Sequence, residues 1–76
     1  MPAKKSPAAR ALGEAIRSAR REREYGQEGF AAHVRLDRSY YGAVERGEFN
    51  ITIDTLLKIT AGLGVRASTL LRRAQL

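Results

Sequence analysis

The chain has 76 residues, with 14 lysines and arginines against 8 aspartates and glutamates, and a formal net charge of +6 at pH 7. This length predicts one domain, and the absence of cysteine excludes disulfides and thiolate metal sites. The basic charge favours a polyanionic partner, either nucleic acid or an anionic membrane surface, and most of it comes from arginine, which suits bidentate contact with phosphate and guanine.

The N-terminal segment carries no targeting pattern. Lys4 and Lys5 are not followed by the apolar segment of a signal peptide, and no apolar run in the chain is long enough to span a bilayer. We therefore expect a cytoplasmic protein with no membrane partner. Residues 1–9 lack helical periodicity and predict a disordered basic arm, which is either a solvated tail or a segment that follows DNA phosphates.

Two helices are predicted in the first half of the chain, from about residue 10 to residue 24 and from about residue 27 to residue 34. Each has one face whose residues recur at helical spacing. Tyr25 and Gly26 interrupt the pattern between them. The first face comprises Leu12, Ile16, Ala19 and Arg23, and the second comprises Phe30, Ala31 and Val34.

The segment over residues 36–47 predicts a third, short helix. Asp37 suits the N-cap because its carboxylate can accept backbone N–H groups of the first turn, and Gly47 suits a left-handed residue just past the end. The helix would have an apolar side to dock and a polar N-terminal end to offer. A helix that reads the major groove of DNA needs both, although a surface helix with a solvated basic face would share this pattern.

Two further helices are predicted over residues 53–63 and 67–73, which gives an all-α domain of five short helices over residues 10–76. Thr52 suits the N-cap of the first of these helices. The leucines of the last helix have little of the domain left to cover. We therefore expect apolar residues in this region, with Phe49 of the preceding turn, to form the interface of a homodimer: Leu63, Val65, Leu70 and Leu71.

The centre of the chain resembles a known family. Residues 27–47 are similar to the helix-turn-helix of the Cro and lambdoid repressor (XRE-type) superfamily, and the resemblance extends over most of the chain. The motifs that carry it are Gln27-Glu28, Ala31, Leu36, Glu45-Arg46-Gly47, the helical stretch from Thr55 to Ile59, and Leu63-Gly64-Val65.

Two strings, Leu36-Asp37-Arg38-Ser39-Tyr40 and Asn50-Ile51-Thr52-Ile53, look most like the controller proteins of bacterial restriction–modification systems. The resemblance implies a five-helix, lambda-repressor-like fold. It also implies a sequence-specific transcription regulator, either repressor or activator, that acts at the bacterial nucleoid. Such a regulator binds a pseudo-palindromic operator on double-stranded DNA as a homodimer and controls its own promoter.

The resemblance also implies roles for individual residues. Glu24 and Arg35 stand where relatives place glycine, so we expect left-handed backbone at both. A structural ion pair between Arg20 and Glu45 would tie the first helix to the third. The implied base contacts are Arg38, Ser39, Tyr40 and Ala43, of which the last has lost the longer side chain of many relatives. The implied phosphate contacts are Gln27, Arg35, Arg46, Asn50 and Thr52.

Two other function classes share parts of the pattern. Some helix-turn-helix domains, such as antitoxins and bridging factors, chiefly bind a protein. An enzyme is disfavoured because His33 is the only histidine and no nucleophile elbow accompanies it. We expect no metal, no cofactor and no small-molecule ligand.

Overall fold

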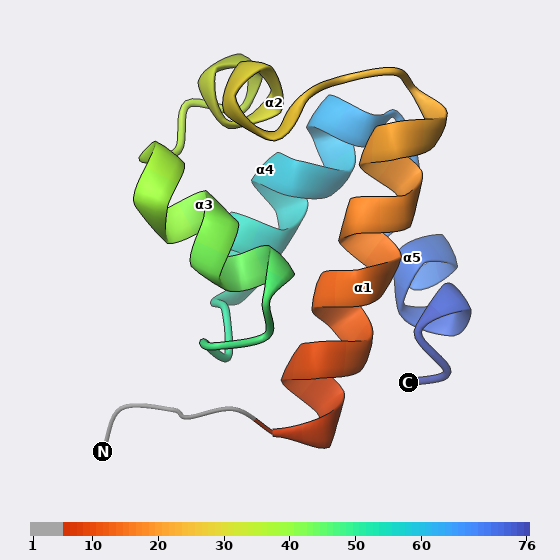
Figure 1. Ribbon diagram of the computed structural model, residues 1–76. Coiled ribbons are helices and arrows are strands. Elements are labelled where there is room, and N and C mark those ends of the chain that lie inside the picture. The colour runs from red at the N-terminus through yellow and green to blue at the C-terminus, as the bar shows by residue number, and fades with distance from the viewer. Residues whose placement is uncertain (1–5) are drawn as a thin grey trace.

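Five helices and no strand make up residues 6–76, the part of the chain that the computed structural model describes (Figure 1). The all-α prediction and the number of helices are therefore confirmed over this range. The last two helices have the predicted bounds. In chain order the helices are α1 (Pro7–Glu22), α2 (Gln27–His33), α3 (Arg38–Glu45), α4 (Ile53–Leu63) and α5 (Ala67–Arg73).

Helix α1 begins three residues earlier than predicted. The Ser6 hydroxyl accepts a hydrogen bond from the Ala9 backbone N–H at 3.0 Å, and Pro7 stands at the first helical position, where its missing N–H and fixed φ do no harm. The prediction of a disordered arm is therefore wrong for residues 7–9, and its first five residues lie outside the described range. Helix α1 ends at Glu22, because Glu24 takes the expected left-handed φ of 61°.

The predicted caps fix the ends of α3 and α4. The Asp37 carboxylate accepts from the Tyr40 N–H at 2.9 Å, and the Thr52 hydroxyl accepts from the Thr55 N–H at 3.0 Å. Past the end of α3, Gly47 has a φ of 75°, which a residue without a Cβ adopts at no steric cost. These caps set where the short α3 begins and ends.

The core lies where α1 packs between α3 and α5, with α4 behind α1 and α3 in the view of Figure 1. Helix α5 packs against α1 and α4, and within a single chain Leu70 is fully buried and Leu63 is 3% exposed. The prediction that these two leucines form a dimer interface is therefore wrong. The largest fully buried side chains are Tyr41, Phe30, Ile16, Ile59 and Leu70.

Helix α1 approaches the C-terminal half of α3 at backbone distance. A Cβ added to Gly13 would lie 2.5 Å from the carbonyl oxygen of Glu45 and 2.6 Å from that of Val44. A side chain at this position would therefore push the two helices apart. Because Gly13 has no side chain, α1 and α3 can pack in backbone contact.

Candidate nucleic-acid interface

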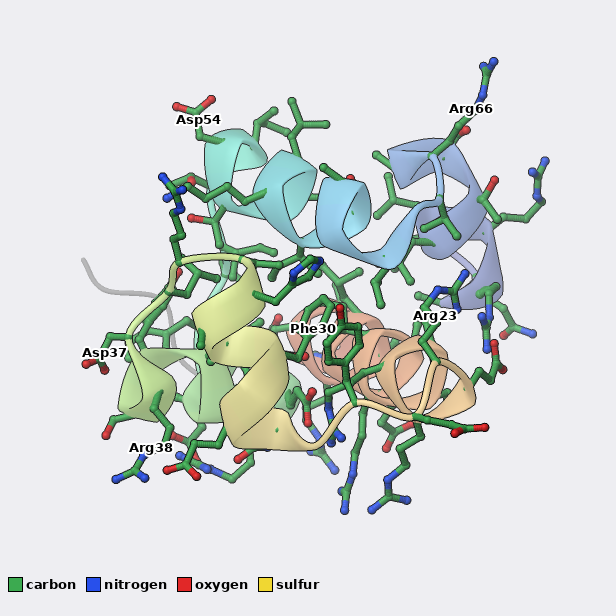
Figure 2. All side chains as sticks on the ribbon, turned by 90° about the horizontal axis from the view of Figure 1, so that it is seen from above. Arg23, Phe30, Asp37, Arg38, Asp54 and Arg66 are labelled. Carbon is green, nitrogen blue, oxygen red and sulfur yellow. The ribbon has the colours of Figure 1, made fainter. Side chains whose placement is uncertain are left out.

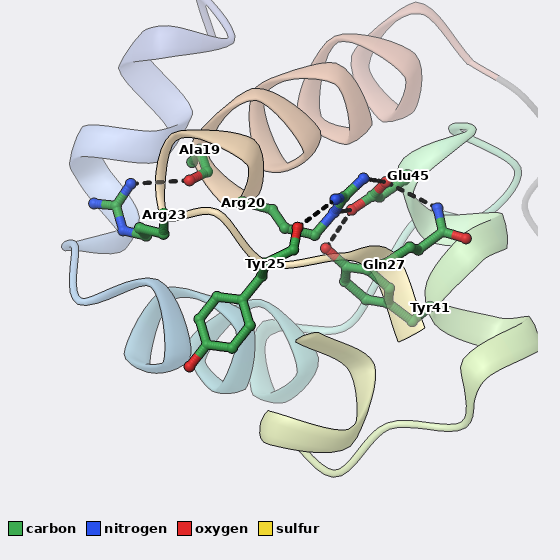
Figure 3. A network of polar contacts seen from close by, with 7 residues as sticks. All are labelled: Ala19, Arg20, Arg23, Tyr25, Gln27, Tyr41 and Glu45. Atoms are coloured by element: carbon green, nitrogen blue, oxygen red, sulfur yellow. Dashed lines mark hydrogen bonds and ion pairs between the residues drawn. The ribbon is translucent and has the colours of Figure 1, made fainter. Parts of the chain in front are cut away.

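A buried polar network joins α1, α2 and α3 (Figure 3). The Arg20 guanidinium donates to both carboxylate oxygens of Glu45, at 2.6 Å and 3.0 Å. The Tyr41 hydroxyl and the Gln27 side-chain amide also donate to this carboxylate, the latter at 3.0 Å. The predicted ion pair is confirmed. The sequence analysis missed Tyr41 as a partner, although Tyr41 and Glu45 stand one helical turn apart.

The network holds its carboxylate in the charged state. Burial alone would raise the pKa of Glu45, but the hydrogen bonds from Arg20, Tyr41 and Gln27 outweigh burial, so the pKa lies below its ordinary value. The same carboxylate raises the pKa of the Arg20 guanidinium, and burial raises the pKa of the Tyr41 hydroxyl. The orientation of α3 is thus set by a fully paired group of charges and hydrogen bonds.

The first turn of α3 faces solvent. Arg38 and Ser39 are exposed, and Figure 2 shows Arg38 and the capping Asp37 at the edge of the molecule. The guanidinium of Arg38 forms an ion pair with Glu28 of α2, and both side chains are about two-thirds exposed. The two leading candidates for base contact are therefore accessible to a duplex.

The other two candidates for base contact lie differently. Tyr40 is half-buried, and the centre of its ring lies 5.6 Å from that of the exposed Phe49. Ala43 is buried at 5% exposure, so its methyl group cannot reach a base edge and this prediction is wrong. Of the four candidates, only Arg38 and Ser39 in the N-terminal turn of α3 are exposed, and Tyr40 is half-buried.

Five exposed residues, from the start of α2 to the start of α4, are the candidates for phosphate contact. The Arg46 guanidinium donates to Glu48 at 2.7 Å, and the Asn50 side-chain oxygen accepts from Ser6 at 3.2 Å.

The other three candidates are Arg35, Gln27 and Thr52. Arg35 has a left-handed φ of 60°, as expected. Gln27 uses its amide N–H on Glu45, which gives it a structural role that the sequence analysis missed. Thr52 uses its hydroxyl to cap α4.

Features of other site types are not found among residues 6–76. No group of three or more histidine, cysteine, aspartate or glutamate side chains in this range could hold a metal ion. The ring of His33 stacks on that of Tyr25, with ring centres 5.1 Å apart. No helix in the described part is long and apolar enough to cross a membrane.

Comparison with known proteins identifies the family. Residues 13–76 match the profile of a family described as a helix-turn-helix domain. The chain belongs to this helix-turn-helix family. It is 42% identical over 60 residues to the control protein C.MunI of Mycoplasma sp, which covers 78% of this chain and 81% of that protein.

Two crystal structures are similar to this helix-turn-helix protein. The restriction–modification controller protein C.AhdI of Aeromonas hydrophila has a TM-score of 0.78 and 34% identity, over 82% of this chain and 90% of that one. The clp gene regulator ClgR of Corynebacterium glutamicum has a TM-score of 0.88 and 26% identity, over 96% and 94%. The five-helix fold and the central helix-turn-helix of α2 and α3 are thus those of known gene regulators.

Proposed function

We propose that this helix-turn-helix regulator binds a pseudo-palindromic operator as a homodimer and controls its own promoter, in the manner of a restriction–modification controller protein. The observation that carries this proposal is the exposed first turn of α3, which offers Arg38 and Ser39 from a helix held rigidly by the buried network. Arg38 is suited to guanine O6 and N7, and Ser39 to either a donor or an acceptor on a base edge.

Phosphate contacts would fix the register of α3 in the groove without reading sequence. The exposed side chains that flank the turn, Arg35 before it and Arg46 after it, are placed to make such contacts. The ion pair of Arg46 with Glu48 is exposed and therefore weak, so the guanidinium can exchange a carboxylate for a phosphate at little free-energy cost.

The proposed dimer interface uses the apolar side chains that the single chain leaves exposed. Ile53 and Leu57, one turn apart on α4, are 69% and 50% exposed. In an antiparallel pairing of two α4 helices about a two-fold axis, Asp54 of one chain would lie opposite Lys58 of the other. The proposed interface keeps three residues of the sequence prediction, namely Phe49 and the half-buried Val65 and Leu71. It adds the exposed Leu76.

Two copies related in this way would place their α3 helices in successive major grooves, about 34 Å apart on one side of the duplex. Selection of bound duplexes from a random pool should return an inverted repeat, and the same repeat should lie upstream of the gene that encodes the protein. Recovery of sequences without two-fold symmetry would contradict the dimeric model.

The oligomeric state has its own test. The variant Leu57→Glu should sediment as a monomer at micromolar concentrations at which the unmodified protein is a dimer, and should lose affinity for the selected operator. Ser68→Glu adds the same charge to an exposed position of α5 and is the matched control. If both variants sediment as dimers, the dimer interface does not include Leu57 of α4, and this part of the proposal is wrong.

A further inference from the structure

The arginines of this protein fall into two groups. Five of them form ion pairs with glutamates: Arg20, Arg23, Arg38, Arg46 and Arg73. The other six form no hydrogen bond or ion pair with their side chains within residues 6–76. Half of this second group belongs to α1, namely Arg10, Arg17 and Arg21, all of them exposed.

These three arginines share one face of α1. At about 100° per residue, Arg10 and Arg21 lie about 20° and about 40° from Arg17 around the helix axis, both on the same side of it, so the three fall within an arc of about 40°. Over 11 residues they extend about 16 Å along the axis, at about 1.5 Å per residue. We call this row of three the α1 arginine stripe. Glu14 lies at its edge, and no ion pair joins it to the stripe, so the net charge of this face stays positive.

The stripe runs beside the helix that we assign to base readout. Gly13 of α1 meets the backbone of α3 at Glu45, and Arg20 binds the Glu45 carboxylate. Arg17 lies one turn along α1 from each of these anchors and about 40° to 60° around the axis, on the solvent side of the contact. At the end of α3, a Cβ on Gly47 would lie 2.6 Å from the Cα of Arg10.

In Figure 2 the labelled Arg38 lies at one edge of the molecule. The labelled Arg66 points toward the opposite edge.

We propose that the α1 arginine stripe is a second DNA-contact surface, which binds phosphates of the duplex beside the groove that α3 occupies. This inference rests on the proposed function, because it takes duplex DNA as the polyanion. An anionic lipid surface would suit the charge equally well, but the position of the stripe alongside α3 favours the duplex. Contacts of this kind add affinity without sequence preference, and each releases condensed counterions.

The test compares two double variants that lose the same charge. Arg17→Gln with Arg21→Gln removes two arginines of the stripe, and Arg66→Gln with Arg72→Gln removes two exposed, unpaired arginines from the region of α5. Fluorescence anisotropy with a labelled 30-base-pair random duplex and with the selected operator, at several salt concentrations, gives the slope of log K against log salt. Thermal unfolding checks that both variants are folded.

The stripe variant should lower this slope by about 2 in magnitude, about 1 for each phosphate contact, on both duplexes. The ratio of operator to random affinity should stay unchanged, and the control variant should keep the slope of the unmodified protein. Equal slopes for the two variants would overturn the proposal that the α1 arginine stripe contacts phosphates. The proposed function would still stand if the unmodified protein binds DNA and prefers the operator to the random duplex. If the unmodified protein binds neither duplex, both proposals fail.

Discussion

The same pair of residue types, arginine and glutamate, occurs in two very different settings in this protein. The side chains of Arg20 and Glu45, between α1 and α3, are 7% and 2% exposed. Those of Arg38 and Glu28, at the solvent edge of the helix-turn-helix, are 67% and 69% exposed. The buried carboxylate also accepts from Tyr41 and Gln27, whereas the exposed pair has water as a competing partner.

The difference in burial separates two tasks. A buried ion pair that loses one partner leaves an uncompensated charge in a medium of low dielectric constant, so the pair is committed to the fold. An exposed pair contributes little to stability, and its arginine is free to exchange a carboxylate for a base edge or a phosphate. On the proposed function, one arginine holds α3 in place and another contacts the DNA.

The largest effect is expected from Glu45→Ala. It strands the charge of Arg20 and the hydroxyl of Tyr41 and should lower the free energy of unfolding by about 3–5 kcal/mol, measured by urea denaturation. The combined variant Arg20→Met, Tyr41→Phe and Glu45→Leu removes the charges together and should lose less. A loss below about 1 kcal/mol for Glu45→Ala would show that the network is not structural.

The close approach of α1 to α3 gives the next effect. Gly13→Ala forces a Cβ against two backbone carbonyls, which cannot move aside as a side chain can, and should destabilise the fold by about 1–3 kcal/mol. Gly29→Ala is the control, since a Cβ there meets nothing within 4 Å. It should stabilise α2 by up to about 1 kcal/mol. Similar unfolding midpoints for both variants would contradict the tight contact.

Substitution of the exposed arginine should affect binding and leave folding nearly intact. Arg38→Ala should weaken operator binding by about 1–3 kcal/mol and relax preference at one base pair, with a change in stability of at most about 1 kcal/mol. Binding to a panel of single-base operator variants measures this preference. Uniform weakening across the panel would reassign Arg38 to a phosphate contact.

Acidification should give the smallest of these effects, because it leaves the protein unchanged near neutral pH. The pKa of Glu45 lies below its ordinary value of 4.5, so its stabilisation is fully present above that value and is lost as the pH falls below it, through the pKa in the folded state. Urea denaturation at a series of pH values should show this loss. Glu45→Gln should be less stable at neutral pH and should lose less on acidification. Parallel pH profiles for the two proteins would exclude Glu45 as the group responsible.

The sequence predicted those parts of the molecule that local chemistry determines. Asp37, Thr52 and Gly47 mark helix ends through capping and backbone freedom, so α3 and α4 were placed correctly. The start of α1 differs from the prediction because Ser6 caps the helix and Pro7 opens its first turn, which apolar periodicity does not reveal. The predictions for Leu63 and Leu70 were wrong for one reason: periodicity shows that a face is apolar but not whether the same chain or a second chain covers it.

The candidate site was predictable only in part. The resemblance to a family supplied the pair of Arg20 and Glu45 and the exposed Arg38, because these positions recur in its motifs. The resemblance could not give the packing of Ala43 or the use of Gln27 on Glu45, which depend on how α2, α3 and the following turn fold against one another.

On the proposed function, the first turn of α3 reads DNA while the buried network only holds α3 in place. Titration of the isotopically labelled protein with the selected operator, followed by amide chemical shifts, tests this claim most directly. We expect the largest changes in amide chemical shift at residues 37–40 and at the start of α2. The backbone amides of Arg20 and Glu45 should be protected from hydrogen exchange both with and without the operator. Changes confined to α4 and α5, with residues 37–40 unaffected, would contradict it.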